Sequence, residues 1–483
     1  MLSARVIRFP LFCLFGILWA QGFARPNLTG AEPVPPAAEK VTPASDTAKN
    51  SDTAKSDSAK DEEYYELLKL FVDTLDQVER NYVQDISRRD LVEAAIQGML
   101  TKLDQHTNYI SPRELDQFKT GVESEFGGIG INVMTRNGEL NIIGAVPGSP
   151  AHRAGLSSGD VITQVEGKPL KGLPIDEAIQ RLKGKAGTTV EFTVRHAKDG
   201  KDESMKLTRE IVRMETVVGY QRKPDNTWDY WLDSAKKLAY IRVGSFARHT
   251  ADELRKALTE LKADGLKGLI FDLRFNPGGL LSAAIEVSDM FVTEGRIVST
   301  SGRNVESRHW DAHRRNTFDG FPIVVVVNRG SASASEIVSA CLQDHQRAVV
   351  AGERSWGKGS VQNVVELEGG HSALKITTAK YFRPSGKDIH RDEQEGEDGE
   401  WGVKPDSALE LRLSIPELHE LSGDLSRRML LWTDGEKAKS ESTFVDRQLQ
   451  KATEYLSAEI AKEAEKSAAA KDEQAKLKDA TEK

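Results

Sequence analysis

The stretch that decides the fold is NRGSASASEIVSACLQD, residues 328–344, which comes directly after the apolar run IVVVV at residues 323–327. An apolar run without polar alternation is typical of a strand covered on both faces, as in a parallel sheet flanked by helices. The small residues after it predict a turn, and the apolar spacing beyond them predicts a helix. A strand, a tight turn and a helix in this order define an α/β unit.

The same alternation of strands and helices precedes this unit. LAYIRV at residues 238–243 and GLIFDLR at residues 268–274 predict strands, and the apolar stripe of residues 254–261 predicts a helix between them. Thr250 and Glu253 are spaced as a capping box, which predicts the start of that helix. We therefore expect an α/β domain.

The turn contains three serines that could act as a nucleophile: Ser331, Ser333 and Ser335. Ser333 and Glu336 are spaced as Ser-x-x-Glu, and a capping box for a helix beginning at Ala334 explains them without any chemistry. The same position suits a nucleophile, because helix N-terminal amides face a developing negative charge. Position alone leaves both interpretations open.

A nucleophilic serine needs a proton acceptor. His345 and His371 lie in no recognisable motif, whereas ERSWGKGSVQN at residues 353–363 places Lys358 between two glycines and close to Trp356. Burial lowers the pKa of a lysine because the charged form loses its hydration, and only the neutral amine can act as a base. A solvated surface charge is the alternative for a single loop lysine, so the context decides.

A small β-rich domain is predicted upstream. FGGIGINV at residues 126–133 and PGSPAHRAGLSSGDVITQVEGKPL at residues 147–170 alternate turn residues with apolar pairs. The loop of Gly128, Ile129 and Gly130 can aim backbone N–H groups at the terminal carboxylate of a peptide that adds as a strand. Glycines at these positions serve a tight strand entry equally well, so the loop alone decides nothing.

These motifs together carry a family resemblance. SPA, AGL, GD-I and GKAGTTV occur in this order within residues 121–213, which resemble a PDZ domain. YIRVGSF, FDLRFNPGGLL, GSASASEIVSACLQD, GERSWGKGSVQ and ALKITTAKYFRPSGKDIH occur in the order found in the C-terminal processing peptidases, a Ser-Lys family of tail-specific proteases, peptidase family S41. With the segment LDQHTNYI at residues 103–110, the resemblance spans residues 62–456.

The resemblance implies a serine endopeptidase that works through an acyl-enzyme and cleaves near protein C-termini. It implies that Ser333 is the nucleophile, that Lys358, 25 residues later, is the general base, and that Gln362 orients the lysine. The implied oxyanion hole is built from backbone N–H groups of Ala334 and of Gly278 or Gly279. The implied PDZ domain binds free C-termini of protein or peptide substrates. No metal and no cofactor is expected.

Two other classes of function stay open. A non-catalytic PDZ scaffold would keep the fold without turnover, and the presence of Ser333, Lys358 and Gln362 together argues against it. A peptidase that works only after docking to an activator or adaptor is the second alternative, and a homo-oligomer is also left open. Phe275 and Trp356 stand where the family commonly has a polar residue and a smaller aromatic residue, which leaves the substrate subsites undefined.

The predicted organisation is a multidomain α/β protein in which a PDZ β-rich domain precedes an α/β protease core resembling the ClpP/crotonase fold. The predicted segments are a signal peptide (1–24), a disordered linker (25–61), an N-terminal helical region (62–120), the PDZ domain (121–213), the S41 core (214–413), a C-terminal helical region (414–457) and a charged tail (458–483). His106 is interpreted as a loop residue with local hydrogen bonds. Residues 303–319 are interpreted as a surface excursion, with a substrate channel as the alternative.

Composition excludes some partners and predicts a location. The net charge is −8 and the basic residues are spread along the chain, so nucleic acid is not expected as a partner. Arg5 and Arg8 precede an apolar run at residues 9–20, the pattern of a signal peptide, so we expect a periplasmic or secreted protein. Membrane anchoring by an uncleaved signal segment is the lesser alternative, because the run is too short to span a bilayer. Outside that run Cys341 is the only cysteine, so no intramolecular disulfide is expected.

Overall fold

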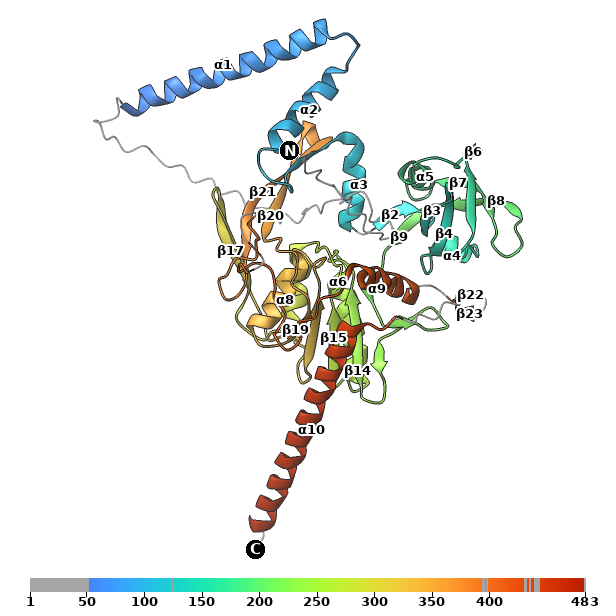
Figure 1. The fold of residues 1–483 in the computed structure, drawn as a ribbon, viewed down its shortest axis with the longest axis vertical. Coiled ribbons are helices and arrows are strands. Elements are labelled where there is room, and N and C mark those ends of the chain that lie inside the picture. Colours follow the sequence, from blue (N-terminus) through green and yellow to red (C-terminus); the bar gives the residue numbers. More distant parts are fainter. Residues whose placement is uncertain are drawn as a thin grey trace, which may run out of the picture. The chain divides into compact units, whose positions relative to one another are not determined.

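The computed structural model describes residues 52–123, 125–392, 396, 398–429, 432–433, 436–437 and 444–481. The predicted signal peptide and most of the predicted linker lie outside these residues. The described chain forms two compact units. The first unit contains residues 117–361 and 378–481, and the second contains residues 52–116 and 362–377. Figure 1 shows the fold and labels many of its helices and strands.

A six-stranded sheet lies at the centre of the first unit. Four strands run parallel, in the order β14 (Leu238–Val243), β15 (Gly268–Asp272), β18 (Ile323–Val327) and β19 (Val349–Gly352). Two short strands pair antiparallel with β14: β10 (Val217–Val218) and β13 (Trp231–Asp233). β14, β15 and β18 are buried along their whole length, as the unbroken apolar runs predicted.

Helices cover this sheet and explain its double burial. The helices of the first unit outside the PDZ region are α6 (Thr250–Ala263), α7 (Leu281–Asp289), α8 (Ala334–Asp344), α9 (Ile415–Arg428) and α10 (Arg447–Thr481). Leu449, Ala452 and Leu456 of α10 pack against Tyr240 and Ile270 of the sheet, and Figure 1 shows α10 running on beyond it. The predicted α/β class is confirmed.

The predicted capping box at the start of α6 is wrong. His249 is the N-cap residue of α6, and it makes no side-chain cap hydrogen bond. The Glu253 carboxylate instead accepts the N–H groups of Thr216 and Val217, both at 3.0 Å, and so ties the helix to the beginning of β10. A partner 37 residues away outcompetes the local one.

The PDZ region forms its own β-sheet in the order β3, β4, β5, β7, β8. Its elements are β2 (Glu125–Gly128), β3 (Ile131–Arg136), β4 (Glu139–Ala145), α4 (Pro150–Arg153), β5 (Val161–Val165), β6 (Lys168–Pro169), α5 (Ile175–Leu182), β7 (Thr189–Arg195), β8 (Asp202–Thr208) and β9 (Glu210–Arg213). β2 pairs with β9 in a separate two-stranded ribbon. Because β3 ends the order, it is an edge strand among the described residues.

The remaining strands of the first unit lie outside the central sheet and the PDZ region. They are β11 (Gln221–Arg222), β12 (Trp228–Asp229), β16 (Arg296–Gly302), β17 (Val305–Asp311), β22 (Trp432–Thr433) and β23 (Glu436–Lys437). β16 pairs with the second half of β21 (Ser372–Phe382). β17, which covers part of the predicted surface excursion, is largely exposed.

The second unit contains the helical region that the sequence predicted. Its elements are α1 (Asp52–Asn81), α2 (Arg88–Leu100), β1 (Asn108–Ile110) and most of β20 (Ser360–Leu367), with the short helix η1 (Glu368–Gly370) and the first half of β21 after them. α3 (Pro112–Glu123) leads into the first unit. α1 begins ten residues before the predicted start at Glu62, within the Ala/Lys/Asp/Ser repeat. Among the helices described, none is long and apolar enough to cross a membrane.

Candidate active site

The three serines in the turn after β18 differ in their burial and hydrogen bonds. Ser331 and Ser335 are fully buried, and their hydroxyls donate to the carbonyls of Leu273 (2.8 Å) and Asn276 (2.9 Å). Ser333 is only half-buried and occupies the N-cap position of α8. The two outer serines therefore fix the turn against the neighbouring loop, and Ser333 remains as the candidate nucleophile.

Ser333 has an unusual backbone conformation. Its φ is +55° and its ψ is −115°, a region that residues with a Cβ rarely adopt. Such strain costs about 1 to 3 kcal/mol and persists only where surrounding bonds fix it. The Ser333 N–H donates to Glu336 Oε2 at 2.8 Å, as the predicted capping box requires, but the Glu336 N–H donates to the Ser333 carbonyl and the Ser333 side chain makes no cap hydrogen bond. A strained serine between a strand and a helix is the geometry of a nucleophile elbow.

Glu336 does more than cap the helix. Its Oε1 accepts the Ser355 hydroxyl at 2.5 Å and the Gly357 N–H at 2.6 Å, and its Oε2 accepts the N–H groups of Ser333 and Lys358, both at 2.8 Å. Burial raises the pKa of Glu336, although each of these donors lowers it. One buried carboxylate thus joins the backbone of the serine turn to the backbone of the lysine loop. Sequence reasoning found only the cap, because partners 19 to 22 residues later leave no local signal.

The glycines around Lys358 are required by close packing. A Cβ on Gly357 would lie 2.7 Å from the Cβ of Arg391, and a Cβ on Gly359 would lie 2.2 Å from the His390 nitrogen. The Lys358 backbone is therefore clamped on both sides, and its side chain is partly buried.

Gln362 lies on β20 in the second unit. Its amide donates to the Thr377 hydroxyl at 3.4 Å, and the Thr377 N–H donates to the Thr107 hydroxyl at 3.1 Å. Thr107 in turn donates to Asp104 at 2.9 Å, and Asp104 also accepts the His106 N–H at 2.7 Å. The LDQHTNYI segment therefore supports Gln362 through Thr107, and His106 makes the local hydrogen bond expected of it.

The NPGG loop, residues 276–279, packs directly against Ser333. Gly278 has a φ of +100°, and a Cβ built there would lie 2.7 Å from the Ser333 Cβ, 2.7 Å from the Ala332 carbonyl oxygen and 2.9 Å from the Ala334 nitrogen. Only glycine fits this approach. The structure thus brings Ser333, Ala334 and Gly278 together.

The backbone N–H groups of this loop are not equivalent. Gly278 N–H donates to Asn276 Oδ1 at 2.9 Å, while the Asn276 side chain donates to the Val243 carbonyl at 2.8 Å. The N–H groups of Gly279 and Ala334 have no acceptor among the described residues. Of the two glycines considered for the oxyanion hole, Gly279 therefore has the available donor.

The two residues that depart from the family pattern have different surroundings. Phe275, at a φ of +59°, packs against the apolar cluster of Leu413, Leu421 and Leu425 at the beginning of the C-terminal region. Trp356 is 51% exposed, and its backbone N–H donates to the Ser331 carbonyl at 2.9 Å. Phe275 thus serves packing, and Trp356 presents an aromatic surface next to the lysine loop.

The predicted carboxylate loop of the PDZ region lies between β2 and β3. Gly130 has a φ of +78°, and a Cβ there would lie 2.2 Å from the Ser149 Cβ. Gly128 ends β2, and the N–H groups of Ile129 and Gly130 meet no acceptor in the part of the chain that the structure describes. The loop therefore offers two backbone donors at the start of edge strand β3.

The two histidines considered as partners of the serine have surroundings of their own. His345 is the C-cap residue of α8, and its Nε2 lies 2.7 Å from the Arg296 carbonyl oxygen. His371 is exposed and comes directly after the short helix η1. Neither His345 nor His371 therefore supports a Ser-His arrangement.

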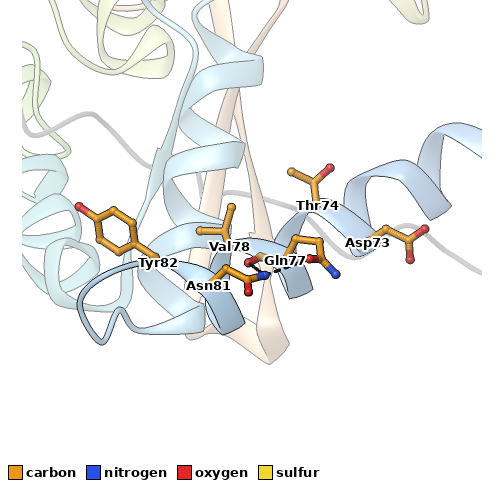
Figure 2. Close-up of a pocket in the computed structure, with 6 residues that line it drawn as sticks. All are labelled: Asp73, Thr74, Gln77, Val78, Asn81 and Tyr82. Carbon is orange, nitrogen blue, oxygen red and sulfur yellow. Dashed lines mark hydrogen bonds between the residues drawn. The ribbon is translucent and has the colours of Figure 1, made fainter.

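A surface hollow along α1 also lacks the chemistry of a catalytic site. Figure 2 shows its lining, which comes entirely from one helix and the residue after it: Asp73, Thr74, Gln77, Val78, Asn81 and Tyr82. The Asn81 amide donates to Gln77 Oε1 at 2.9 Å within this set. No serine, cysteine, lysine or histidine is among these six residues, so the serine turn remains the candidate active site.

Family models match three parts of the chain. Residues 237–409 match peptidase family S41, residues 142–196 match a PDZ domain, and residues 36–111 match the activating protease CtpB N-terminal domain. These matches define a serine peptidase of family S41 that carries a PDZ domain.

Similar proteins show which group of family S41 peptidases this chain resembles. A carboxy-terminal-processing protease of Bartonella bacilliformis is 34% identical over 417 residues, which cover 82% of this chain and 89% of that protein. A probable CtpA-like serine protease of Staphylococcus aureus is 34% identical over 333 residues, so that the match covers 68% of this chain and 62% of that protein. The solved photosystem II D1 C-terminal processing protease is 31% identical, with a TM-score of 0.39 and coverage of 70% of this chain and 86% of that one. The chain belongs to the carboxy-terminal-processing protease family.

Proposed function

We propose that this protease cleaves protein chains near their free C-termini, with Ser333 as the nucleophile, Lys358 as the general base and Gln362 as the residue that orients the lysine. The Glu336 carboxylate is the observation that carries the proposal. It binds the backbone N–H groups of Ser333 and Lys358 on the same oxygen, both at 2.8 Å. A bond of this kind holds nucleophile and base loops in a fixed relation, as nucleophilic catalysis requires.

The reaction proceeds through an acyl-enzyme. The Ser333 oxygen attacks the scissile carbonyl carbon, and its proton passes to the neutral amine of Lys358. The carbonyl oxygen becomes an oxyanion that accepts the N–H groups of Ala334 and Gly279. When the tetrahedral intermediate collapses, the C–N bond breaks and Lys358 returns the proton to the leaving amine. Water then attacks the ester carbonyl carbon while Lys358 takes a proton from it. When the second tetrahedral intermediate collapses, the bond between the Ser333 oxygen and the carbonyl carbon breaks, Lys358 gives that proton to the Ser333 oxygen, and the new carboxyl terminus leaves.

Substrate delivery is assigned to the PDZ domain. β3 is an edge strand among the described residues, so a peptide can extend the sheet by pairing with it. The N–H groups of Ile129 and Gly130 lie at the beginning of that strand, where the terminal carboxylate of an added peptide would end. The partner is therefore a protein or peptide with a free C-terminus.

Export of the protein is part of the same proposal. Two arginines ahead of an apolar run at residues 9–20 support a signal peptide and a periplasmic or secreted location. Fractionation of cells that express the full chain tests it: activity in the periplasm or medium supports export, and activity confined to the cytoplasm contradicts it.

The experiment that tests the function uses an unfolded protein with an apolar C-terminal tail, with its terminal carboxylate free or blocked. Wild type should cleave it, Ser333→Ala and Lys358→Met should not, and blocking the carboxylate should slow the wild type. Lys387→Met is the matched control, because the amine of this exposed lysine pairs with Glu400 on the surface and its loss should leave cleavage unchanged.

The outcomes separate the competing functions. Cleavage by Ser333→Ala at the wild-type rate would refute the assigned nucleophile. Wild type that cleaves only after tail peptide is added would favour a resting state that needs an activator. Wild type that binds tail peptide without cleaving under either condition would favour the scaffold.

A further inference from the structure

Arg274 is the largest fully buried side chain among the described residues, and it lies just before the NPGG loop. Its Nε and Nη2 donate to Asp272 at 3.0 Å and 2.6 Å, so one edge of the guanidinium is fully hydrogen-bonded. Tyr240 donates its hydroxyl to the same carboxylate at 2.7 Å. These partners come from neighbouring strands of the sheet and fix the base of the loop.

The other edge of the Arg274 guanidinium is hydrogen-bonded to the C-terminal region. Asp446 accepts two hydrogen bonds from it, at 2.9 Å from Nη1 and 2.8 Å from Nη2, and Gln448 Oε1 accepts a third at 3.2 Å. A bidentate pair of this kind fixes direction as well as distance. Asp446 also accepts the Leu449 N–H at 3.0 Å, so the same carboxylate binds both Arg274 and the first turn of α10.

A second contact between the C-terminal region and the loop is apolar. Phe275, the next residue, packs against Leu413, Leu421 and Leu425 and holds a left-handed backbone with a φ of +59°. Its N–H donates to Asn328 Oδ1 at 2.9 Å. Two consecutive residues just before the NPGG loop are thus held by elements far later in the chain, 172 residues later in the case of Asp446.

The position of Arg274 matters for the loop after it. Asn276, two residues on, accepts the Gly278 N–H on its side chain and the Ala332 N–H on its carbonyl, at 2.9 Å and 3.0 Å. The Gly278 backbone in turn touches Ser333. A shift of Arg274 is therefore transmitted along the backbone to the donor groups beside the nucleophile.

We propose that the start of α10, together with Asp446 just before it, is a positioning element of the active site: Asp446 and Gln448 hold Arg274 and so hold the NPGG loop in its catalytic shape. This inference rests on the oxyanion role proposed above for that loop. A buried ion pair is weak evidence for stability, because apolar residues can replace it at little cost. A role in orientation gives these charges a function that packing alone does not.

The test compares three full-length variants with the wild type. Asp446→Asn keeps the shape and removes the charge. Gln448→Met is the milder change, and it removes the bond from Arg274 at 3.2 Å together with the bond from the Gln448 amide to the Leu411 carbonyl at 2.8 Å. Arg447→Gln is the matched control on the same turn, since its bonds go to Glu417 of α9 at 2.6 Å and 2.9 Å and not to Arg274. Two measurements are made on each: kcat and KM well below the melting temperature, and amide hydrogen exchange over residues 273–280.

We expect Asp446→Asn to lower kcat by about tenfold or more with KM within about twofold of the wild type, because a donor aimed at the transition state is misplaced. Exchange over residues 273–280 should be faster, Gln448→Met should show the same changes to a smaller degree, and Arg447→Gln should show neither. A loss of stability alone would not produce this split between kcat and KM.

Two results would overturn the inference: unchanged loop exchange in Asp446→Asn, or faster exchange with unchanged kcat. A Gly278→Ala variant separates this failure from failure of the proposed function. If Gly278→Ala is fully active, the loop is not catalytic and the proposed function fails at that point. If Gly278→Ala is inactive while Asp446→Asn matches the wild type, only the positioning role fails.

Discussion

Replacing Gly278 by alanine tests how closely the NPGG loop approaches the nucleophile. The added methyl carbon would lie 2.7 Å from the Ser333 Cβ and 2.7 Å from the Ala332 oxygen. Carbon atoms in contact lie about 3.5 to 4.0 Å apart, so the loop or the serine must move by roughly 1 Å. A displacement of about 1 Å at reacting groups can cost about 100-fold in rate, and loss of one oxyanion donor costs about 100- to 1,000-fold in kcat.

The matched control is Gly320→Ala. Gly320 has a φ of +81°, close to the +100° of Gly278, but no atom lies within 4 Å of a Cβ built there. Both variants should lose about 1 to 2 kcal/mol of folding free energy from the left-handed backbone. Only Gly278→Ala should lose kcat, by about 100-fold or more.

Thermal melting and steady-state cleavage of a tailed substrate measure the two effects separately. A Gly278→Ala enzyme within about threefold of wild-type kcat would refute the close approach as a catalytic requirement. An equal loss of kcat in Gly320→Ala would show that backbone strain, and not position, is the cause.

Buried and paired groups elsewhere allow three more predictions. Glu336→Gln should lower kcat at least about tenfold, because an amide nitrogen cannot accept the two donors that one carboxylate oxygen accepts in the wild type; wild-type kcat in this variant would contradict the clamp. The hydrogen bonds from Ser414 and the pairing with Arg447 lower the pKa of Glu417 to about 2. Its stabilisation is therefore complete above the ordinary value of 4.5 and is lost as the pH falls toward 2, so the difference in melting temperature between wild type and Glu417→Gln should be constant at neutral pH and shrink below pH 4.5. Burial raises the pKa of Cys341 to about 12, so a thiol reagent should label it only after unfolding, and rapid labelling of the native protein would contradict its burial.

The core of the fold can be predicted because its signals are local. The apolar run of residues 323–327 and the small residues after it specify a buried strand, a turn and a helix within one stretch of chain. The capping box at Ser333 can be predicted for the same reason. The true partners of Glu253 cannot, since this carboxylate finds the N–H groups of Thr216 and Val217 only in the folded chain.

The parts of the site that sequence reasoning missed depend on distant partners. The pairing of Arg274 with Asp446 spans 172 residues, and no periodicity or motif links the two positions. Glu336 was visible only as a cap, because its bonds to Gly357 and Lys358 form when two loops meet. The spacing of residues within one helix or strand can be read from the sequence, whereas contacts between helices, strands and loops are known only from the folded structure.

The identity of the nucleophile is tested most directly by covalent labelling with a fluorophosphonate and peptide mapping of the product. We predict one phosphonyl group per chain, attached to the Ser333 oxygen, and loss of cleavage in proportion to labelling. Loss of cleavage with the label on another residue, or full cleavage by protein labelled completely at Ser333, would contradict this assignment.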